Sequence, residues 1–210
     1  MEHALHNRHP QILEPALYVV ATPIGNLRDI TLRALDVLAA ADVVAAEDTR
    51  NTAHLLTHHG IGANRLMALH QHNERGATEK IIALLRAGQS VAFVSDAGTP
   101  AVSDPGALLV QAVLAAGLRV IPIPGANAAV AALSAAGLAD PHFLFYGFLP
   151  NKSAARRTAL QELCGHPYTL VFYEAPHRIA GCVADLCAIL GGERQIVLAR
   201  EITKLFETIH

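Results

Sequence analysis

Two groups of charged residues directly follow apolar segments of the sequence. In AEDTRNT (46–52) two acids and an arginine come after VVAA (43–46), and in FYEAPHRI (172–179) an acid, a histidine and an arginine follow TLVFY (169–173). Open α/β sheets bind ligands at the carboxyl ends of their strands, so these side chains would face a substrate. The residues concerned are Glu47, Asp48, Arg50, Glu174, His177 and Arg178.

The acids that follow segment 43–46 also have a structural interpretation. Asp48 or Thr49 would cap the N-terminus of the next helix, and the arginine could pair with one of the acids. The sequence alone leaves both interpretations open.

The longest polar loop, SDAGTPAVSDPG (95–106), lies between the apolar segments VAFV and ALLVQAVLAAG. Its last three residues have a structural role, since Asp104 suits an N-cap and Pro105 a first helical position. SDAGTP is not needed for that role, and its glycine and proline bend the backbone so that amides and carbonyls are left free. We interpret SDAGTP as a ligand-binding loop, in which Asp96 either contacts the ligand or braces the loop.

Two further loops combine glycine, proline and small residues. In TPIGNL (22–27), Gly25 allows the backbone to approach a ligand closely, although the loop matches neither G-x-G-x-x-G nor G-x-x-x-x-G-K-[ST]. In PIPGANAAVAAL (122–133), small side chains leave the helix amides accessible and leave room for a flat ring. The alternatives are an ordinary strand–helix turn and close helix–sheet packing by alanines.

Lys152, Arg156 and Arg157 cluster at the start of a predicted helix, where the helix dipole disfavours cations. The cluster therefore indicates an anionic partner, with a plain solvated face as the alternative. The formal net charge of −2 argues against a strongly electrostatic nucleic-acid binder but allows a local basic patch.

Alternating strand and helix patterns must position these loops. The chain has 210 residues, of which 52% are hydrophobic and 16% charged, which suits an α/β protein with a buried parallel sheet. The predicted strands are 17–22, 43–46, 66–70, 91–95, 119–124, 143–148, 169–173 and 195–202. The predicted helices are 31–40, 51–59, 80–87, 105–116, 126–136, 153–164 and 178–190.

Other features exclude several classes of protein. Cys164, Cys182 and Cys187 form no CxxC pair, which favours buried reduced thiols in a cytosolic protein over disulfides or a metal site. No apolar run approaches the roughly 18 residues that span a bilayer. Residues 1–15 lack a signal-peptide layout and are expected to be a flexible tail.

Six segments resemble one family in order and spacing, the ribosomal RNA small subunit methyltransferase I family of the tetrapyrrole methylase superfamily. They are TPIGNLRDITLRAL, AEDTRNTAHLL, SDAGTPAVSDPG, PIPGANAAVAALSAAGL, FYGFLP and FYEAPHRI, within residues 16–210. The resemblance implies a two-lobed α/β fold with a mostly parallel sheet in lobe 16–122 and a mixed sheet in lobe 123–210. It also implies a cytoplasmic homodimer that acts on 16S rRNA in the small ribosomal subunit.

By this resemblance, the enzyme transfers a methyl group from S-adenosylmethionine to the ribose 2′-oxygen of a cytidine. The implied cofactor-binding residues are Pro23, Gly25, Asn26, Asp96, Ala97, Gly98, Thr99, Ser103, Gly125, Ala126, Asn127, Ala128, Phe148, Tyr173 and Ala175. A weak nucleophile such as a 2′-hydroxyl needs a base, for which the candidates are Glu47, Asp48, Glu174 and His177. The residues expected to contact RNA phosphates are Arg50, Lys152, Arg156, Arg157 and Arg178.

Two other functions remain open on sequence grounds. A same-fold enzyme could methylate a precorrin ring, and a non-catalytic module could bind only the cofactor or the ribosome. Members of the family usually continue beyond the segment that corresponds to residue 210. We therefore expect a truncated chain, whose last strand, 195–202 and onward, ends without a partner.

Overall fold

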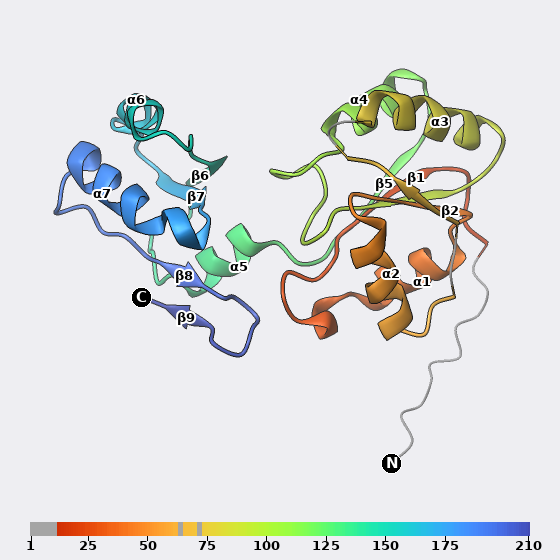
Figure 1. The fold of residues 1–210 in the computed structure, drawn as a ribbon, viewed down its shortest axis with the longest axis horizontal. Helices are drawn as coiled ribbons and strands as arrows, with labels where there is room; N and C mark the ends of the chain where they lie inside the picture. The colour runs from red at the N-terminus through yellow and green to blue at the C-terminus, as the bar shows by residue number, and fades with distance from the viewer. Residues whose placement is uncertain (1–11, 63–64, 71–72) are drawn as a thin grey trace, which may run out of the picture. The chain divides into compact units, whose positions relative to one another are not determined.

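The computed structural model describes residues 12–62, 65–70 and 73–210 (Figure 1). The contacts divide the chain into two compact units, Met1–Asn127 and Ala128–His210, and each is described by itself. The sequence placed the lobe boundary five residues earlier, between 122 and 123. The part of the predicted flexible tail that spans 1–11 lies outside the described residues.

The first unit is built on a five-stranded parallel sheet of order β3-β2-β4-β1-β5. Its strands are β1 (Leu17–Val20), β2 (Val43–Ala46), β3 (Arg65–Ala68), β4 (Val91–Val94) and β5 (Val120–Ile123). The central strands β2 and β4 are buried at every position, as expected for continuous apolar runs covered on both faces.

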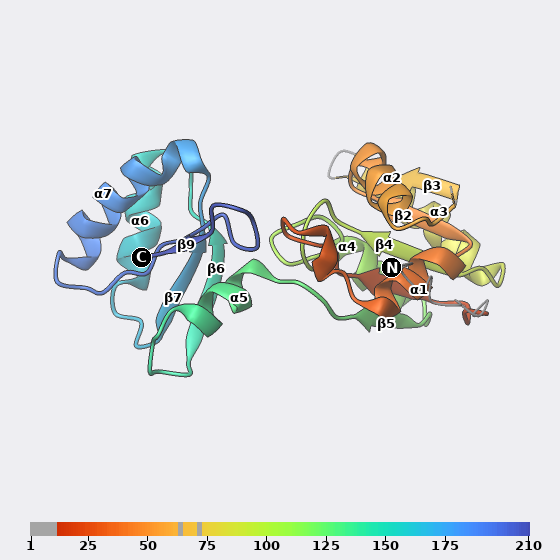
Figure 2. The same ribbon diagram turned by 90° about the horizontal axis from the view of Figure 1, so that it is seen from below.

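Helices cover both faces of this sheet (Figures 1 and 2). The helices α1 (Leu32–Ala40) and α2 (Thr49–His58) pack on one face, and α3 (Glu74–Arg86) and α4 (Ala107–Ala115) pack on the other. A short 3-10 helix, η1 (Leu27–Asp29), precedes α1. Asp48 is the N-cap of α2 and accepts a hydrogen bond from the Arg50 amide, which confirms its predicted capping role.

The start of α4 differs from the prediction. Asp104 is not its N-cap and Pro105 is not its first helical residue, because Ala101 and Ser103 adopt positive φ and extend the loop further. Gly106 occupies the N-cap position with φ 115°, and its amide donates a 3.1 Å hydrogen bond to Glu74 Oε1. This amide, which has no partner within α4, is therefore bound by a side chain from α3.

The second unit carries α5 (Ala128–Ala135), followed by a parallel pair of strands, β6 (Phe143–Phe148) and β7 (Thr169–Tyr173). Two helices, α6 (Ser153–Leu163) and α7 (Ile179–Leu190), pack together, with Leu160 and Cys182 in the buried core (Figure 2). A 3-10 helix, η2 (Pro176–Arg178), leads into α7. The core of this unit is much smaller than that of the first unit.

The C-terminal segment corrects two predictions. The strand predicted at 195–202 is reduced to β8 (Ala199–Arg200), because Glu201 and Thr203 have positive φ and turn the chain. The last strand, β9 (Thr208–Ile209), pairs with β8 in antiparallel register, so the expectation of an unpaired final strand is wrong. Parallel and antiparallel pairs are thus both present in this unit, as two separate sheets.

Smaller differences concern α3 and the cysteines. Helix α3 begins at Glu74, six residues before the predicted start at 80, and β3 begins at Arg65. All three cysteines are free, but only Cys182 is buried, whereas the other two are exposed. Among the described residues, no helix is long and apolar enough to cross a bilayer.

We expect the replacement of Gly106 by alanine to destabilise the first unit strongly. An added Cβ would lie 2.2 Å from Cε1 of the fully buried Phe93, and the φ of 115° disfavours any side chain. We predict that urea denaturation gives a free energy of unfolding lower by about 3 kcal/mol.

Gly88→Ala is the matched control, since Gly88 also has positive φ but an added Cβ meets nothing within 4 Å. Its free energy of unfolding should fall by about 1 kcal/mol, from backbone strain alone. Equal decreases in the two variants would show that the contact with Phe93 does not cause the larger destabilisation expected for Gly106→Ala.

Candidate functional site

Hydrogen bonds join three loops at the carboxyl edge of the first sheet. The backbone of Thr22 pairs with that of Gly98 through two hydrogen bonds of 2.9 and 3.0 Å. Thr22 Oγ1 also donates to the Ser95 carbonyl at 3.2 Å, and Thr99 Oγ1 donates to the Ala126 carbonyl at 3.1 Å. The loops that follow β1, β4 and β5 therefore form one connected structure.

This bonding corrects the expectation that the backbone of SDAGTP is free throughout. The amide and the carbonyl of Gly98 are both used by Thr22. Gly98 has φ +81°, a conformation that residues with a side chain rarely adopt, which explains the need for glycine here. Gly125 is needed for a different reason, since an added Cβ would clash with the Ala21 Cβ at 2.9 Å.

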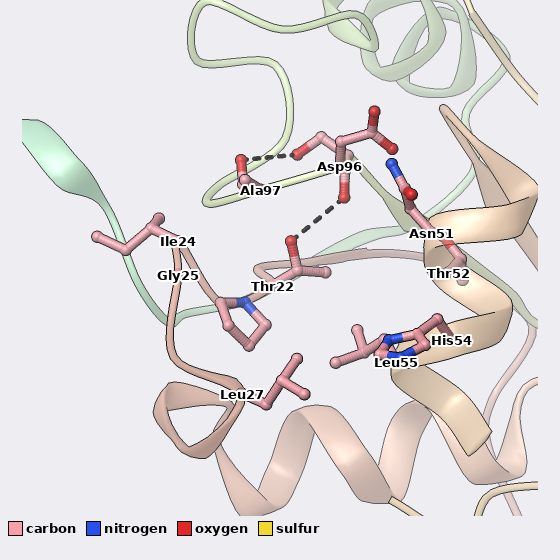
Figure 3. A pocket seen from close by; sticks show the side chains of 12 residues that line it. Thr22, Ile24, Gly25, Leu27, Asn51, Thr52, His54, Leu55, Asp96 and Ala97 are labelled. Atoms are coloured by element: carbon pink, nitrogen blue, oxygen red, sulfur yellow. Dashed lines mark hydrogen bonds between the residues drawn. The ribbon is translucent and has the colours of Figure 1, made fainter. Parts of the chain in front are cut away.

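A cavity of about 250 Å³ opens between helix α2 and the loops that follow β1 and β4 (Figure 3). Apolar side chains form one part of its wall, and hydroxyl, amide, carboxylate and imidazole groups form the rest. It is lined by Thr22, Pro23, Ile24, Gly25, Leu27, Asn51, Thr52, His54, Leu55, Ser95, Asp96 and Ala97. A wall of this mixed kind suits a ligand with both polar and apolar parts.

Sequence reasoning missed the contribution of α2 to this cavity. Asn51, His54 and Leu55 come from its first two turns, and Figure 3 shows them opposite the loop that contains Gly25. Their spacing of three and four residues places them on one helix face. Because α2 begins directly after the acids that follow β2, that spacing could have indicated a second wall.

Three carboxylates lie close together beside the cavity. The Asp96 amide donates to Glu47 Oε2 at 3.3 Å, and the Asp48 amide donates to Asp96 Oδ1 at 3.2 Å. Asp96 therefore braces the loop after β2, in addition to lining the cavity. Glu47 is half-buried, and burial together with the charges of neighbouring acids raises the pKa of its carboxyl.

Asp48 has a different environment from Glu47. Its two oxygens accept hydrogen bonds from Arg50 Nε at 3.1 Å and from Arg50 NH2 at 2.7 Å. The side-chain and backbone hydrogen bonds from Arg50 lower the pKa of Asp48 to about 2. A carboxylate of such low pKa is a poor base, and Asp48 is also committed to capping α2.

The candidate base in the second unit is also committed to an ion pair. Glu174 lies 2.6 Å from Arg178 Nε and accepts a 2.8 Å hydrogen bond from the Ala175 amide. Although burial raises the pKa of Glu174, these hydrogen bonds outweigh it and leave the pKa below its ordinary value. His177 lies next to this pair in η2 and is exposed.

The basic cluster at the start of α6 has an anionic partner inside its own unit. Asp185 accepts hydrogen bonds from Arg156 Nε at 2.8 Å, Arg157 Nε at 2.8 Å and Ser153 Oγ at 2.9 Å. The Arg156 side chain is only 6% exposed, so the expectation that it contacts RNA phosphates conflicts with its burial. Arg157 is half exposed, and Lys152 is exposed at the N-cap of α6.

The remaining predicted cofactor residues fall into two groups, one in each unit. In the first unit, Asn26 caps η1 and the exposed Ser103 has φ 62°. In the second unit, the rings of Phe148 and Tyr173 are in edge contact at 5.5 Å between centroids, and the Tyr173 hydroxyl accepts a hydrogen bond from the Ala129 amide. Asn127 ends the first unit, and Ala128 begins α5 of the second.

A metal centre needs several ligands close together. Among residues 12–62, 65–70 and 73–210, no three histidine, cysteine or acidic side chains are arranged to hold a metal ion.

Comparison with known proteins places the chain in a family. The family model of tetrapyrrole (corrin/porphyrin) methylases matches residues 16–210. The chain is 56% identical over 92% of its length to the ribosomal RNA small subunit methyltransferase I of Escherichia coli O157:H7, of which it covers 68%. It is 55% identical to the protein of the same name from Xylella fastidiosa, with 92% of this chain and 70% of that protein covered.

Solved structures of other methyltransferases share the fold. The methyltransferase CobJ matches with a TM-score of 0.69 at 21% identity, over 93% of this chain and 84% of that one. Uroporphyrin-III-C-methyltransferase from Thermus thermophilus matches with a TM-score of 0.61 at 25% identity, over 93% of this chain and 83% of that one. The chain therefore belongs to the tetrapyrrole methylase family and, within it, to the ribosomal RNA small subunit methyltransferase I family.

Proposed function

We propose that this chain transfers a methyl group from S-adenosylmethionine to the ribose 2′-oxygen of a cytidine in 16S rRNA. The observation that carries the rRNA substrate is the 56% identity with a relative named ribosomal RNA small subunit methyltransferase I, over 92% of the chain. The motif resemblance supplies the choice of a cytidine 2′-oxygen. We further propose that the enzyme acts as a homodimer in the cytoplasm, on the small ribosomal subunit.

In this proposal, the connected loops of the first unit hold the cofactor. Pro23, Gly25, Asp96 and Ala97 line the cavity, and Gly98 and Thr99 fix the loop that carries two of them. Once bound, S-adenosylmethionine supplies a methyl group that is already activated for transfer. The protein's main task is then to position the 2′-oxygen in line with that methyl group.

We assign the general base to Glu47 rather than to the other three candidates. Its raised pKa brings it closer to neutral pH, where a base is most effective, and its Oε1 accepts no hydrogen bond in the described structure. Asp48 and Glu174 are each bound by an arginine. The exposed His177 is the second candidate.

Lys152 is the strongest candidate for an RNA phosphate contact in the second unit. It is exposed at the start of α6, and no side-chain hydrogen bond or ion pair involves its ammonium group in the described part of the chain. Arg50 is also exposed, but it would have to share its guanidinium with Asp48. Arg157 would similarly share its guanidinium with Asp185.

Methylation of a precorrin-type ring by the same fold is the competing function. The solved structures that act on such rings are 19–25% identical to this chain, whereas the named rRNA methyltransferases are 52–56% identical. This difference favours RNA. Because these relatives are named methyltransferases, the comparison also disfavours a non-catalytic module.

Nucleoside mass spectrometry of 16S rRNA from cells with and without the gene tests the substrate. We expect one 2′-O-methylcytidine to disappear from the rRNA of the deletion strain and to return on complementation. An unchanged set of ribose-methylated cytidines in the deletion strain would contradict the proposal.

Gly98→Val tests the assignment of the cofactor to the first unit. Valine at φ +81° and in contact with Ile24 would distort the loop, so calorimetry should give an S-adenosylmethionine affinity at least about tenfold weaker. Gly88→Val is the control, because Gly88 has φ +82° and nothing within 4 Å of an added Cβ. If Gly98→Val bound the cofactor like the wild type, the loop assignment would be wrong.

Glu47→Gln tests the base. Its amide oxygen can still accept the Asp96 amide, so the loop should stay intact while kcat falls about 100-fold or more. Because the pKa of Glu47 is raised, the unprotonated base of the wild type is lost as pH falls through a value above that of an ordinary glutamate. The acid limb of the wild-type pH profile should therefore be absent from the variant, and a variant with wild-type kcat would rule Glu47 out.

A further inference from the structure

The loop 149–152 connects β6 to α6 and carries Lys152 at its end. Leu149 is 2% exposed, whereas Lys152 is exposed. A lysine at a loop end samples many orientations unless the backbone that carries it is held. The contacts made by the carbonyls of this loop therefore decide where the ammonium group of Lys152 can reach.

One of these carbonyls is held by Arg178. Arg178 NH2 donates to the Leu149 carbonyl at 3.0 Å, while its Nε lies 2.6 Å from Glu174 Oε1. The side chains of Arg178 and Glu174 are 18% and 7% exposed. The guanidinium thus links the loop after β6 to the segment after β7.

The next two carbonyls are held by Arg156. Its NH1 lies 3.4 Å from both the Pro150 and the Asn151 carbonyls, which are long hydrogen bonds that share one donor group. Its Nε and NH2 bind Asp185 Oδ2 at 2.8 and 2.7 Å. Both side chains of this pair are less than 10% exposed.

Each arginine thus uses one part of its guanidinium for a buried carboxylate and another for the loop. A lysine could keep the ion pair but has no rigid second arm for the carbonyls. Buried ion pairs add little net stability compared with apolar packing, so stability alone does not account for two of them at this loop.

We infer that Arg156 and Arg178 are positioning residues that hold three consecutive carbonyls, those of residues 149–151, and thereby direct Lys152 toward the RNA backbone. This inference rests on the proposed function, because it assigns a purpose to Lys152 as an RNA contact. It replaces the direct phosphate contact that the sequence suggested for both arginines.

Charge-conserving variants test the inference. Arg178→Lys and Arg156→Lys keep a cation beside Glu174 and Asp185 but remove the arm that binds the loop. Ile189→Ala is the control for general destabilisation, since Ile189 packs against the core of the same unit and its side chain has no hydrogen-bond donor for these carbonyls. All variants are measured as the full chain, with small ribosomal subunits and S-adenosylmethionine as substrates.

A double-mutant cycle with Lys152→Ala separates positioning from general destabilisation. We expect Lys152→Ala and Arg178→Lys each to raise the KM for the small subunit about tenfold, with kcat nearly unchanged. In the Lys152→Ala background, Arg178→Lys should add less than about twofold. The inference would be overturned if the two substitutions raised KM independently in the double variant, or if Lys152→Ala had the wild-type KM.

Limited trypsin digestion gives a readout that does not depend on activity. Trypsin cleaves after both lysine and arginine, so the two substitutions create no new site. In both arginine variants, cleavage after Lys152 should become about tenfold faster while cleavage at other bonds stays unchanged. In Ile189→Ala, cleavage after Lys152 should not become selectively faster. Unchanged cleavage would overturn the inference, whereas a wild-type chain that digests as expected but does not methylate RNA would instead contradict the proposed function.

Discussion

The backbone pairing of Thr22 with Gly98 is the interaction on which the first-unit site depends. Two hydrogen bonds of 2.9 and 3.0 Å join the loops that follow the neighbouring strands β1 and β4. This pairing requires positive φ at Gly98, and it sets the position of Thr99, whose hydroxyl reaches the Ala126 carbonyl. The cavity and the Glu47–Asp96 contact are built around that frame.

The two units use charge in different ways. In the first unit, burial and the charges of neighbouring acids raise the pKa of Glu47, and one oxygen of its carboxyl accepts no hydrogen bond from the described residues, which suits proton transfer. In the second unit, Asp185 and Glu174 are each paired with a buried or half-buried arginine. Their role is to fix loops, and the proposed RNA contact is left to Lys152. The formal net charge of −2 is compatible with a phosphate contact that is confined to a local basic site.

Local sequence patterns predicted the elements better than the partners of individual side chains. VAFV became the buried strand β4 and Asp48 became an N-cap, because apolar periodicity and capping act within a few residues. Asp104 is not the cap because the loop extends past it, and the Gly106 amide at the helix start is bound by Glu74, 32 residues earlier in the sequence. Arg156 was assigned to RNA because its partner Asp185 is 29 residues away in the sequence. The contribution of α2 to the cavity was missed because the loops on its opposite side, 22–27 and 95–97, are distant from α2 in the sequence.

The identity of the methylated atom is the most direct test of the proposed function. Small ribosomal subunits isolated from the deletion strain can be incubated with this chain and S-adenosylmethionine labelled in its methyl group, and the rRNA then hydrolysed with alkali. A methyl group on a ribose 2′-oxygen blocks cleavage of the adjacent phosphodiester, so we expect label in an alkali-resistant dinucleotide that begins with cytidine. Label in mononucleotides, or no incorporation into rRNA, would contradict the proposed function.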